Sequence, residues 1–266
     1  MKKFLLAALA LVMMLTCFTA CGGQSDLAYV EDNGKLTIGI TIYSPMNYYD
    51  DNGDLIGFDT EFAKAVCAKL GVEPDFKVID WKNKETELKA KNIDAIWNGL
   101  TVTEERRENM DFSTSYLINK QCIVIKKEDA EKYTSTESLK DALLTAEAES
   151  AGETAIKADK NLKNATYNPS DSQQNAFVAL LAGNVDAIVV DYTMAKSTCG
   201  SGDYKDFVMI EGIELTQEEY AIGFRVGSDM TAKVNKIIEE LVADGTLKKI
   251  AEKYDLTDLY EEALGK

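Results

Sequence analysis

The sequence predicts an α/β protein made of two similar lobes, each a mixed, mostly parallel sheet flanked by helices. Residues 35–107 alternate between apolar strand patterns and helix patterns, which is typical of a mostly parallel sheet covered by helices. One unit of this pattern occurs twice, as N-I-D-A-I at residues 92–96 and as N-V-D-A-I at residues 184–188. Because 266 residues can form two domains of ordinary size, the repeat favours two lobes over one continuous sheet.

The composition argues against several classes of function. The net charge of −16 repels phosphate backbones, so we expect no nucleic-acid partner. The chain contains no histidine, the commonest general base and metal ligand, which argues against most enzyme mechanisms and against a metal site. It also lacks a glycine-rich phosphate loop and a dinucleotide fingerprint, so we expect no cofactor.

The first residues are typical of an export signal. Two lysines precede an apolar run at residues 4–15 that is too short to span a bilayer comfortably, and small residues follow up to Ala20. We therefore expect a signal peptide at residues 1–20. The small residues before Cys21 resemble the processing site of a bacterial lipoprotein, which predicts a lipid on Cys21 and a flexible tether at residues 21–33. The alternative is an ordinary cleaved signal with an incidental cysteine.

Three further cysteines would remain in the mature chain. Cys67 falls on the apolar face of a predicted helix and is expected to be a buried small hydrophobe. A bridge between Cys122 and Cys199 is possible in an exported protein, but the sequence does not establish it. The spacing of these cysteines fits no zinc site.

The first predicted elements belong to lobe 1. Residues 35–43 alternate as a strand does, and Pro45 ends the regular pairing. A helix follows, with Asp59 as its N-cap and Gly71 after its last turn. The remaining elements are a strand at residues 75–81, a helix at 85–91 and a strand at 93–97.

The last of these strands leads to a candidate anion-binding site. A short polar loop containing Asn98, Gly99 and Thr101 follows the strand, and Thr103 is a good N-cap for the next helix. Arg106 then places a fixed guanidinium in the first helical turn, beside outward-facing backbone N–H groups. A planar carboxylate can be gripped there by two parallel hydrogen bonds. The alternative is a solvated arginine paired with a neighbouring glutamate, which would contribute little.

Lobe 2 shows a similar alternation. The expected elements are a strand at residues 122–125, a polar helical segment across 139–143, a strand-to-helix turn at 145–153 and a helix at 175–181. A strand then ends at Asp191. The turn contains a second candidate anion site at the backbone N–H groups of Ala151 and Gly152, although a plain strand–helix connection explains the same residues.

The chain then returns to lobe 1. After an apolar stretch at residues 207–213, residues 219–225 read as a strand. Ser228 or Asp229 caps a strongly amphipathic helix, Gly245 ends it, and one more helix follows.

Two lobes would share one cleft. Arg106 and Asp191 each follow the carboxyl end of a strand of the repeated unit, where ligands bind in open α/β sheets. Facing lobes would therefore offer Arg106 to a carboxylate and Asp191 to an ammonium group. Residues 34–117 and 217–266 are expected to form lobe 1, with residues 118–216 inserted as lobe 2. Two crossing strands would make a hinge that lets the lobes close around a ligand.

Taken together, the ordered pieces resemble the extracellular solute-binding proteins (family 3) of ABC importers for polar amino acids, over nearly all of the mature chain. The matching pieces are Y-S-P at residues 43–45, G-F-D at 57–59, the stretch 92–106, S-A-G-E at 150–153, the strand 185–191 and E-E-Y-A-I-G-F-R at 218–225. The resemblance implies a two-lobed periplasmic-binding-protein-like fold of type II with a two-strand hinge. It also implies that Arg106 binds the ligand's α-carboxylate and Asp191 its α-ammonium. The other ligand contacts that it implies are Tyr43, Trp81, Asn98, Gly99, Thr101, Ala151, Gly152 and Glu153.

The same resemblance implies a function without catalysis. A monomer, held by lipid at the outer face of the cytoplasmic membrane, would capture a free L-amino acid and deliver it to the transmembrane subunits of an ABC permease. Ile40 stands where members that bind basic amino acids often carry an acid, which favours a polar uncharged ligand, whereas Glu153 keeps a basic one open. One alternative is an enzyme on the same scaffold, such as an exported prephenate- or arogenate-type dehydratase or a cell-wall lyase, with Glu153 or Glu149 as its acid. Another is the ligand-sensing domain of a receptor.

Overall fold

The structure, a computed structural model, describes residues 24–213 and 215–264. The predicted signal peptide and Cys21 lie outside the described residues. In the described part of the chain, no helix is long and apolar enough to cross a membrane.

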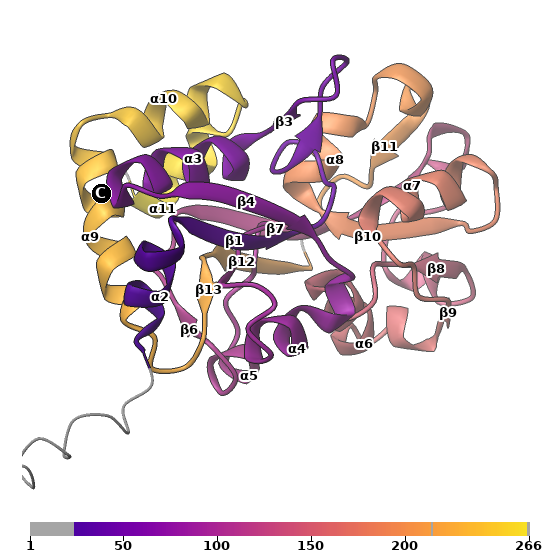
Figure 1. Cartoon of the computed structure of the whole chain (residues 1–266). Coiled ribbons are helices and arrows are strands. Elements are labelled where there is room, and N and C mark those ends of the chain that lie inside the picture. Colours follow the sequence, from indigo (N-terminus) through magenta and orange to yellow (C-terminus); the bar gives the residue numbers. More distant parts are fainter. Residues whose placement is uncertain (1–23, 214, 265–266) are drawn as a thin grey trace, which may run out of the picture.

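Lobe 1 is built on a five-stranded mixed sheet with the strand order β4-β1-β5-β13-β6 (Figure 1). β1 pairs in parallel with β4 and β5, whereas β13 pairs antiparallel with β5 and β6. The strands are β1 (Lys35–Ile40), β4 (Glu73–Val78), β5 (Ala95–Ile96), β6 (Asp111–Phe112) and β13 (Gly223–Phe224), with a separate antiparallel ribbon of β2 (Tyr48–Tyr49) and β3 (Leu55–Ile56).

The helices of lobe 1 surround this sheet and enclose the apolar core of the lobe. They are α2 (Asp26–Asn33), α3 (Phe58–Leu70), α4 (Lys84–Lys89), α5 (Glu104–Arg107), α9 (Asp229–Ala243), α10 (Thr246–Lys253) and α11 (Thr257–Leu264). The ring of Phe62 on α3 lies 4.9 Å from that of Trp97 and 5.3 Å from that of Tyr116, edge to face in both cases. All three rings are fully buried. Their packing fixes α3 against the strand that leads to the predicted anion site.

Lobe 2 contains a second mixed sheet, with the strand order β11-β7-β10-β8-β9. β7 pairs antiparallel with β10 and β11, whereas β8 pairs in parallel with β10 and β9. The elements are β7 (Leu117–Lys126), β8 (Leu143–Thr145), β9 (Thr166–Tyr167), β10 (Ala187–Asp191) and β11 (Phe207–Met209), flanked by α6 (Ala151–Ala158), α7 (Gln173–Leu181) and α8 (Tyr192–Thr198).

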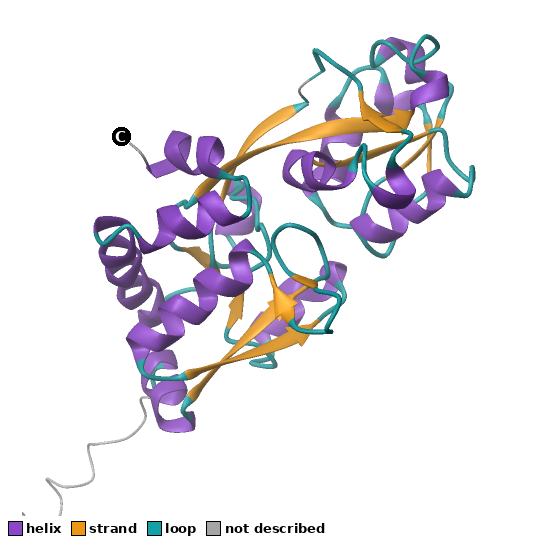
Figure 2. Ribbon diagram, turned by 90° about the horizontal axis from the view of Figure 1, so that it is seen from above, coloured by secondary structure: helices purple, strands orange, loops and turns teal. Residues whose placement is uncertain are grey.

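Two strands connect the lobes. The first half of β7 pairs antiparallel with β12 (Thr216–Tyr220), and its second half pairs with β10 and β11 inside lobe 2. Figure 2 shows these long strands passing from one lobe to the other. The predicted fold class, two α/β lobes joined by a two-strand hinge, is confirmed. Because only two strands cross, the lobes can rotate about them while both sheets stay intact.

The repeated N-[IV]-D-A-I unit has the same structure in both lobes. In lobe 1, Oδ2 of Asp94 accepts a hydrogen bond from the backbone N–H of Thr37 on β1 (3.1 Å). In lobe 2, Oδ2 of Asp186 accepts one from the backbone N–H of Leu143 on β8 (2.8 Å). Each aspartate therefore ties the start of its own strand to the neighbouring parallel strand, which explains why this residue occurs in both copies.

Some local predictions were wrong. Residues 219–225 do not form one strand, because the chain leaves the hinge after Tyr220 and enters the lobe 1 sheet at Gly223. Asp59 does not cap α3; its buried side chain accepts a hydrogen bond from Gly99 N–H at 2.7 Å, and Gly57 occupies the cap position. The helical segment predicted across 139–143 is only a 3-10 turn at Glu137–Leu139.

The structure also gives the state of the cysteines, where the predicted burial of Cys67 is confirmed, and corrects the segment before lobe 1. Cys67, Cys122 and Cys199 are free thiols, so the Cys122–Cys199 bridge that the sequence left open is not formed. Residues 26–33, which were expected in the flexible tether, form α2, and Val30 on this helix is fully buried in the lobe 1 core.

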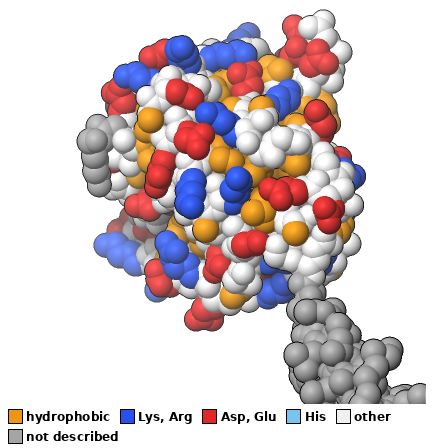
Figure 3. Space-filling view, turned by 60° about the vertical axis from the view of Figure 1, so that its left-hand side comes forward, with side chains coloured by type: hydrophobic (Ala, Val, Ile, Leu, Met, Phe, Trp, Pro, Cys, Tyr) orange, Lys and Arg blue, Asp and Glu red, His pale blue; other side chains and the backbone are white. Residues whose placement is uncertain are grey.

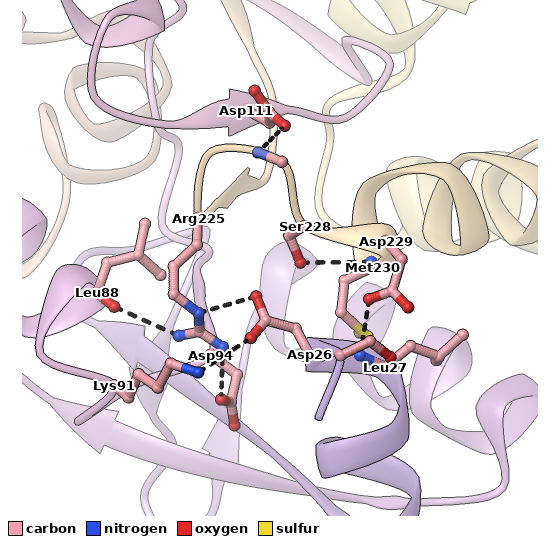
Figure 4. Close-up of polar contacts among 12 residues, drawn as sticks. Asp26, Leu27, Leu88, Lys91, Asp94, Asp111, Arg225, Ser228, Asp229 and Met230 are labelled. Carbon is pink, nitrogen blue, oxygen red and sulfur yellow. Dashed lines mark hydrogen bonds and ion pairs between the residues drawn. The ribbon is translucent and has the colours of Figure 1, made fainter. Parts of the chain in front are cut away.

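Arg225 holds α2 against lobe 1 (Figure 4). Its Nε donates to Asp26 at the start of α2 (2.9 Å), and its Nη2 donates to Asp94 of the repeated unit (3.1 Å). Its Nη1 donates to the backbone carbonyl of Ile93 (2.7 Å). The three side chains of this network are at most 12% exposed. By contrast, Lys and Arg side chains elsewhere on this face of the molecule stand in solvent among Asp and Glu side chains (Figure 3).

We expect Arg225→Ala to lower the free energy of unfolding by roughly 3 kcal/mol, because it removes the guanidinium from two largely buried carboxylates and leaves only Asp26 with another cation, Lys91 at 3.7 Å. The measurement is urea unfolding followed by circular dichroism. Lys35→Ala is the matched control, because it breaks an ion pair with Asp75 whose side chains are 54% and 44% exposed, and it should change the stability little. Equal effects of the two substitutions would show that the buried network has no special role.

Candidate functional site

A small cavity lies between the lobes at the carboxyl ends of β5 and β10. Its volume is about 10 Å³, enough for roughly one water molecule. An open cleft of about 480 Å³ adjoins it and shares Thr101, Arg106 and Ala151 with it, so the cavity is the closed inner end of a larger groove. The residues that line the cavity are Trp81, Asn98, Gly99, Thr101, Arg106, Glu147, Ser150, Ala151, Gln173 and Asp191.

Arg106 contributes the positive charge of the cavity. Its backbone N–H donates to the hydroxyl of Thr103, which caps α5 as predicted. The guanidinium is 8% exposed; its Nη1 donates to the carbonyl of Thr101 (2.8 Å) and its Nη2 to the carbonyl of Glu149 in lobe 2 (3.2 Å). Among the described residues, no carboxylate forms an ion pair with it. Because α5 has only four residues, the fixed charge of Arg106 rather than a helix dipole attracts an anion here.

Asp191 contributes the negative charge from the other lobe. It is the last residue of β10 and is 7% exposed. Its Oδ1 accepts hydrogen bonds from Asn119 (2.9 Å) and Gln121 (2.5 Å), and its Oδ2 accepts one from Gln173. Burial raises the pKa of Asp191 above its usual value, and the nearby carboxylate of Glu218 raises it further. Three neutral carboxamides therefore donate hydrogen bonds to this carboxylate and leave its negative charge unpaired.

Glu218 on β12 links the two sides of the cavity. Its Oε2 accepts hydrogen bonds from Thr101 in lobe 1 (2.9 Å) and from Asn119 and Gln121 on β7 (3.2 Å each). These are the same two amides that hold Asp191. The hinge strands therefore carry the side chains that position the carboxylate of Asp191.

The lobe 1 loop is held rigid by its own hydrogen bonds. Oδ1 of Asn98 accepts from the backbone N–H of Thr41 (3.0 Å), and its Nδ2 donates to the hydroxyl of the same residue (2.6 Å). Gly99 has φ +56, and a Cβ there would approach rings of Tyr43 and Tyr220 to 2.9 Å, so both conformation and space require glycine. The loop thus presents its backbone, Asn98 and Thr101 to the cavity.

The lobe 2 loop at the start of α6 faces the lobe 1 loop. Ser150 caps this helix by accepting from the backbone N–H of Glu153 (3.2 Å). The first turn leaves the N–H groups of Ala151 and Gly152 without partners inside the helix. A Cβ on Gly152 would come within 2.8 Å of the carbonyl of Val189, so glycine lets the helix approach β10 closely. Ala151 lines the cavity, but the structure does not place Gly152 in the lining.

Besides Gly152, two more predicted contacts do not reach the cavity. Glu153 bends back on its own loop, where it accepts from the backbone N–H of Glu149 (2.7 Å) and pairs with Lys157 (2.9 Å). Tyr43 is 2% exposed and lies behind Gly99, with its hydroxyl bonded to that of Thr193 on α8 (2.7 Å). The position of a residue in the sequence predicts the element to which it belongs but not the direction of its side chain, which is why these two contacts were predicted wrongly.

Trp81 does line the cavity, beside a buried lysine that the sequence did not single out. Lys84 Nζ lies 5.0 Å from the centre of the Trp81 ring and donates to the backbone carbonyls of Trp81 (3.4 Å) and Glu149 (3.1 Å). Burial, and after it the nearby charge of Arg106, lowers the pKa of Lys84 to about 8. An ammonium group at the cleft therefore adds to the attraction for a carboxylate.

Glu147 is the other lining residue that sequence reasoning missed. It is 3% exposed, and its Oε1 has no hydrogen-bond partner among the described residues. Burial, and after it the charge of Asp191, raises the pKa of Glu147 to about 8, against the opposing effect of Lys84. The sequence offered only a weak signal for it, an acid two residues before Glu149 at the end of a predicted strand. Ser150 and Gln173 were likewise not predicted to line the cavity.

The lobes touch across the cleft in this structure. Besides the hydrogen bonds from Arg106 and Lys84 to Glu149, the hydroxyl of Ser197 on α8 donates to the carbonyl of Ser44 (3.1 Å). No group of three or more Cys, Asp or Glu side chains within residues 24–213 and 215–264 is arranged to hold a metal ion. The described residues thus form a small cavity between the lobes that is lined by charged and polar side chains.

Known proteins with similar sequences and structures bind amino acids. The chain is 29% identical over 227 residues to the L-cystine-binding protein TcyJ of Escherichia coli (strain K12), covering 85% of this chain and 84% of that one. It superimposes on an ancestral arginine-binding protein bound to arginine with a TM-score of 0.78, at 33% identity over 83% of this chain and 98% of that one. It is also similar to AncCDT-1, an ancestral amino acid-binding protein described as a precursor of cyclohexadienyl dehydratase (TM-score 0.79, 29% identity, 86% and 99% covered).

The family model of the bacterial extracellular solute-binding proteins, family 3, matches residues 36–257. This range includes both lobes and every described residue of the cavity lining. The chain belongs to the bacterial extracellular solute-binding proteins of family 3.

Proposed function

We propose that this protein captures a free L-amino acid between its two lobes and delivers it to an ABC permease. The observation that carries the proposal is the pair of buried charges in one cavity, Arg106 from lobe 1 and Asp191 from lobe 2, which do not pair with each other. An α-amino acid carries the two complementary charges about one carbon atom apart. Its carboxylate would bind Arg106 and the N–H groups of the α6 loop, and its ammonium group would bind Asp191.

The energetics favour a zwitterion over other small molecules. Burying an isolated charge is costly unless it is paired and hydrogen-bonded. Arg106 and Asp191 are already desolvated and already positioned, so a ligand with both charges gains two ion pairs while ordering few protein groups. A ligand with only one of these charges would leave the other protein group unpaired, and this discriminates against it.

Lobe movement is part of the proposed function. The cavity of about 10 Å³ is too small for an amino acid, so the ligand enters when the lobes separate about β7 and β12. The carbonyl of Glu149, which accepts from both Arg106 and Lys84, occupies a position that a ligand carboxylate would take over. A permease that contacts both lobes would then distinguish the closed, occupied form from the open one.

Lobe 1 favours a polar uncharged ligand side chain. Ile40, at the end of β1, is fully buried in the core and supplies no acid to the cavity. Asn98 and Thr101 supply neutral hydrogen-bonding groups instead. Glu147, from lobe 2, is the one lining side chain that favours a basic ligand. The similar proteins named for cystine and arginine support an amino acid but do not select one.

We further propose that the mature protein is a monomer anchored by lipid on Cys21 to the outer face of the cytoplasmic membrane. The support is the sequence alone, an export signal at residues 1–20 followed by Cys21. Because α2 packs on lobe 1, a flexible tether would end near Ser25 and hold the protein by that lobe.

A dehydratase-like enzyme is the second candidate. It is favoured by Glu147, whose raised pKa of about 8 in a closed cavity suits a general acid, and by the similarity to a dehydratase precursor. The absence of histidine and the intact pair of zwitterion-binding charges favour binding over catalysis.

Screening of thermal stability against the twenty amino acids, with mass spectrometry of each mixture after incubation, tests the proposal. We expect one or a few amino acids to raise the melting temperature and to be recovered unchanged. Conversion of a bound compound would instead establish the enzyme, and no stabilisation by any amino acid would refute the capture of free amino acids.

We expect Arg106→Ala to weaken ligand binding by roughly 2–5 kcal/mol, since it leaves the α-carboxylate buried without its partner. Isothermal titration calorimetry measures the change. Arg107→Ala is the matched control, because this neighbouring guanidinium is 50% exposed and lies over the Phe112 ring. A similar loss in both variants would point to long-range charge rather than to a carboxylate clamp.

Binding should weaken at acidic pH through Asp191. The ligand ammonium pairs with the ionised carboxylate, so affinity is complete above the pKa of Asp191 in the empty protein and falls as the pH drops through it. Because burial and Glu218 raise this pKa, the loss begins at a higher pH than for an ordinary aspartate near 3.8. Titrations between pH 4 and pH 8 should show this decline, and Asp191→Asn should remove most binding at every pH. An affinity that stays constant down to pH 4 would exclude Asp191 as the ammonium partner.

A further inference from the structure

Glu147 is the one ionisable group of the cavity to which the zwitterion-binding scheme gives no partner. Arg106 is taken by the α-carboxylate and Asp191 by the α-ammonium of the ligand. Glu147 lines the same cavity, at the end of β8 in lobe 2, with 97% of its surface buried and Oε1 unpartnered. A buried carboxyl oxygen without a hydrogen bond costs about 1–3 kcal/mol. Such a group is therefore retained for a partner that arrives with the ligand.

The cations nearest to Glu147 are committed elsewhere. Lys84 donates to two backbone carbonyls, and Arg106 donates to the carbonyls of Thr101 and Glu149. Neither forms an ion pair with Glu147, although both lower its pKa from a distance. The acids that face it, Asp191 and Asp80, raise this pKa. Charged groups therefore lie around Glu147, but none of those named here forms a hydrogen bond or an ion pair with it.

We propose that Glu147 recognises the side chain of the bound amino acid and selects one that ends in a cationic nitrogen donor, a guanidinium or an ammonium group. The proposal rests on the proposed function and names its ligand class. A basic side chain supplies the hydrogen bond that Oε1 lacks and the positive charge that an ionised carboxylate needs in a closed cavity. It replaces the expectation of an uncharged ligand, which rested on Ile40 in lobe 1 and left a basic ligand open only through Glu153; of these two acids of lobe 2, Glu147 lines the cavity and Glu153 does not.

The proposed contact between Glu147 and a cationic side chain predicts that the protein releases a proton when the ligand binds. Burial raises the pKa of Glu147 to about 8, so most empty molecules carry a proton on it at pH 7. A cationic side chain binds the ionised form, and the proton leaves to the solvent. Affinity for a basic amino acid should therefore rise as the pH increases from 6 towards 8. An uncharged side chain such as an amide can bind the protonated form and releases no proton.

Calorimetry of the wild type and of Glu147→Gln with L-arginine and L-glutamine at pH 7 tests the proposal. We expect the substitution to weaken arginine binding by roughly 30-fold or more, as expected for removing one partner of a buried charge pair. Glutamine binding should change much less, which also shows that the variant is folded. Repeating the arginine titration in phosphate and in imidazole buffer should reveal nearly one proton released by the wild type and none by the variant.

Glu131→Gln is the matched control, since it removes one carboxylate charge from an exposed position of the same lobe. It should leave the affinity for arginine and the proton release unchanged. Equal weakening of both ligands by Glu147→Gln, an unaltered arginine affinity, or a wild type that binds glutamine but not arginine would each overturn the role of Glu147. In these cases the proposed capture of amino acids still stands. A wild type that binds no amino acid would instead overturn the proposed function itself.

Discussion

The structure depends on two opposite charges that are buried near each other and kept apart. Arg106 and Asp191 face one cavity, yet each is hydrogen-bonded only by neutral groups, backbone carbonyls in one case and carboxamides in the other. A direct ion pair would satisfy both charges and leave nothing for a ligand. Holding them in separate lobes keeps part of their desolvation cost uncompensated, and under the proposed function a zwitterion would supply the missing partners and couple its binding to lobe closure.

The two hinge strands carry residues of the site in addition to connecting the lobes. Asn119 and Gln121 lie on β7, and Glu218 lies on β12 opposite them in the antiparallel pairing. The two amides hold Asp191, while Glu218 accepts from them and from Thr101, whose carbonyl holds Arg106. Rotation about the two strands therefore changes the environment of both charges. Glu147 in the cavity lining and Lys84 in the open cleft add a second pair of ionisable groups to the two sides of the site.

Patterns within short stretches of sequence predicted much of the fold. Strand and helix alternation, the cap at Thr103 and the end of α3 at Gly71 depend on residues within one turn of one another. The N-[IV]-D-A-I repeat predicted two lobes, and the matching hydrogen bonds of Asp94 and Asp186 give the reason. The division of residues 219–225 between two sheets could not be predicted, because it depends on which distant strands pair with each half.

By itself the sequence determined the α/β lobes, the acidic, histidine-free character of the chain and the two charged residues at strand ends, since each follows from local chemistry. Only the tertiary structure decided which side chains enter the cavity. Tyr43 turns away from it to contact Thr193, 150 positions further along the chain, whereas Oε1 of Glu147 has no hydrogen-bond partner among the described residues. The direction of a side chain is set by packing between residues far apart in the chain, and no local pattern encodes that packing.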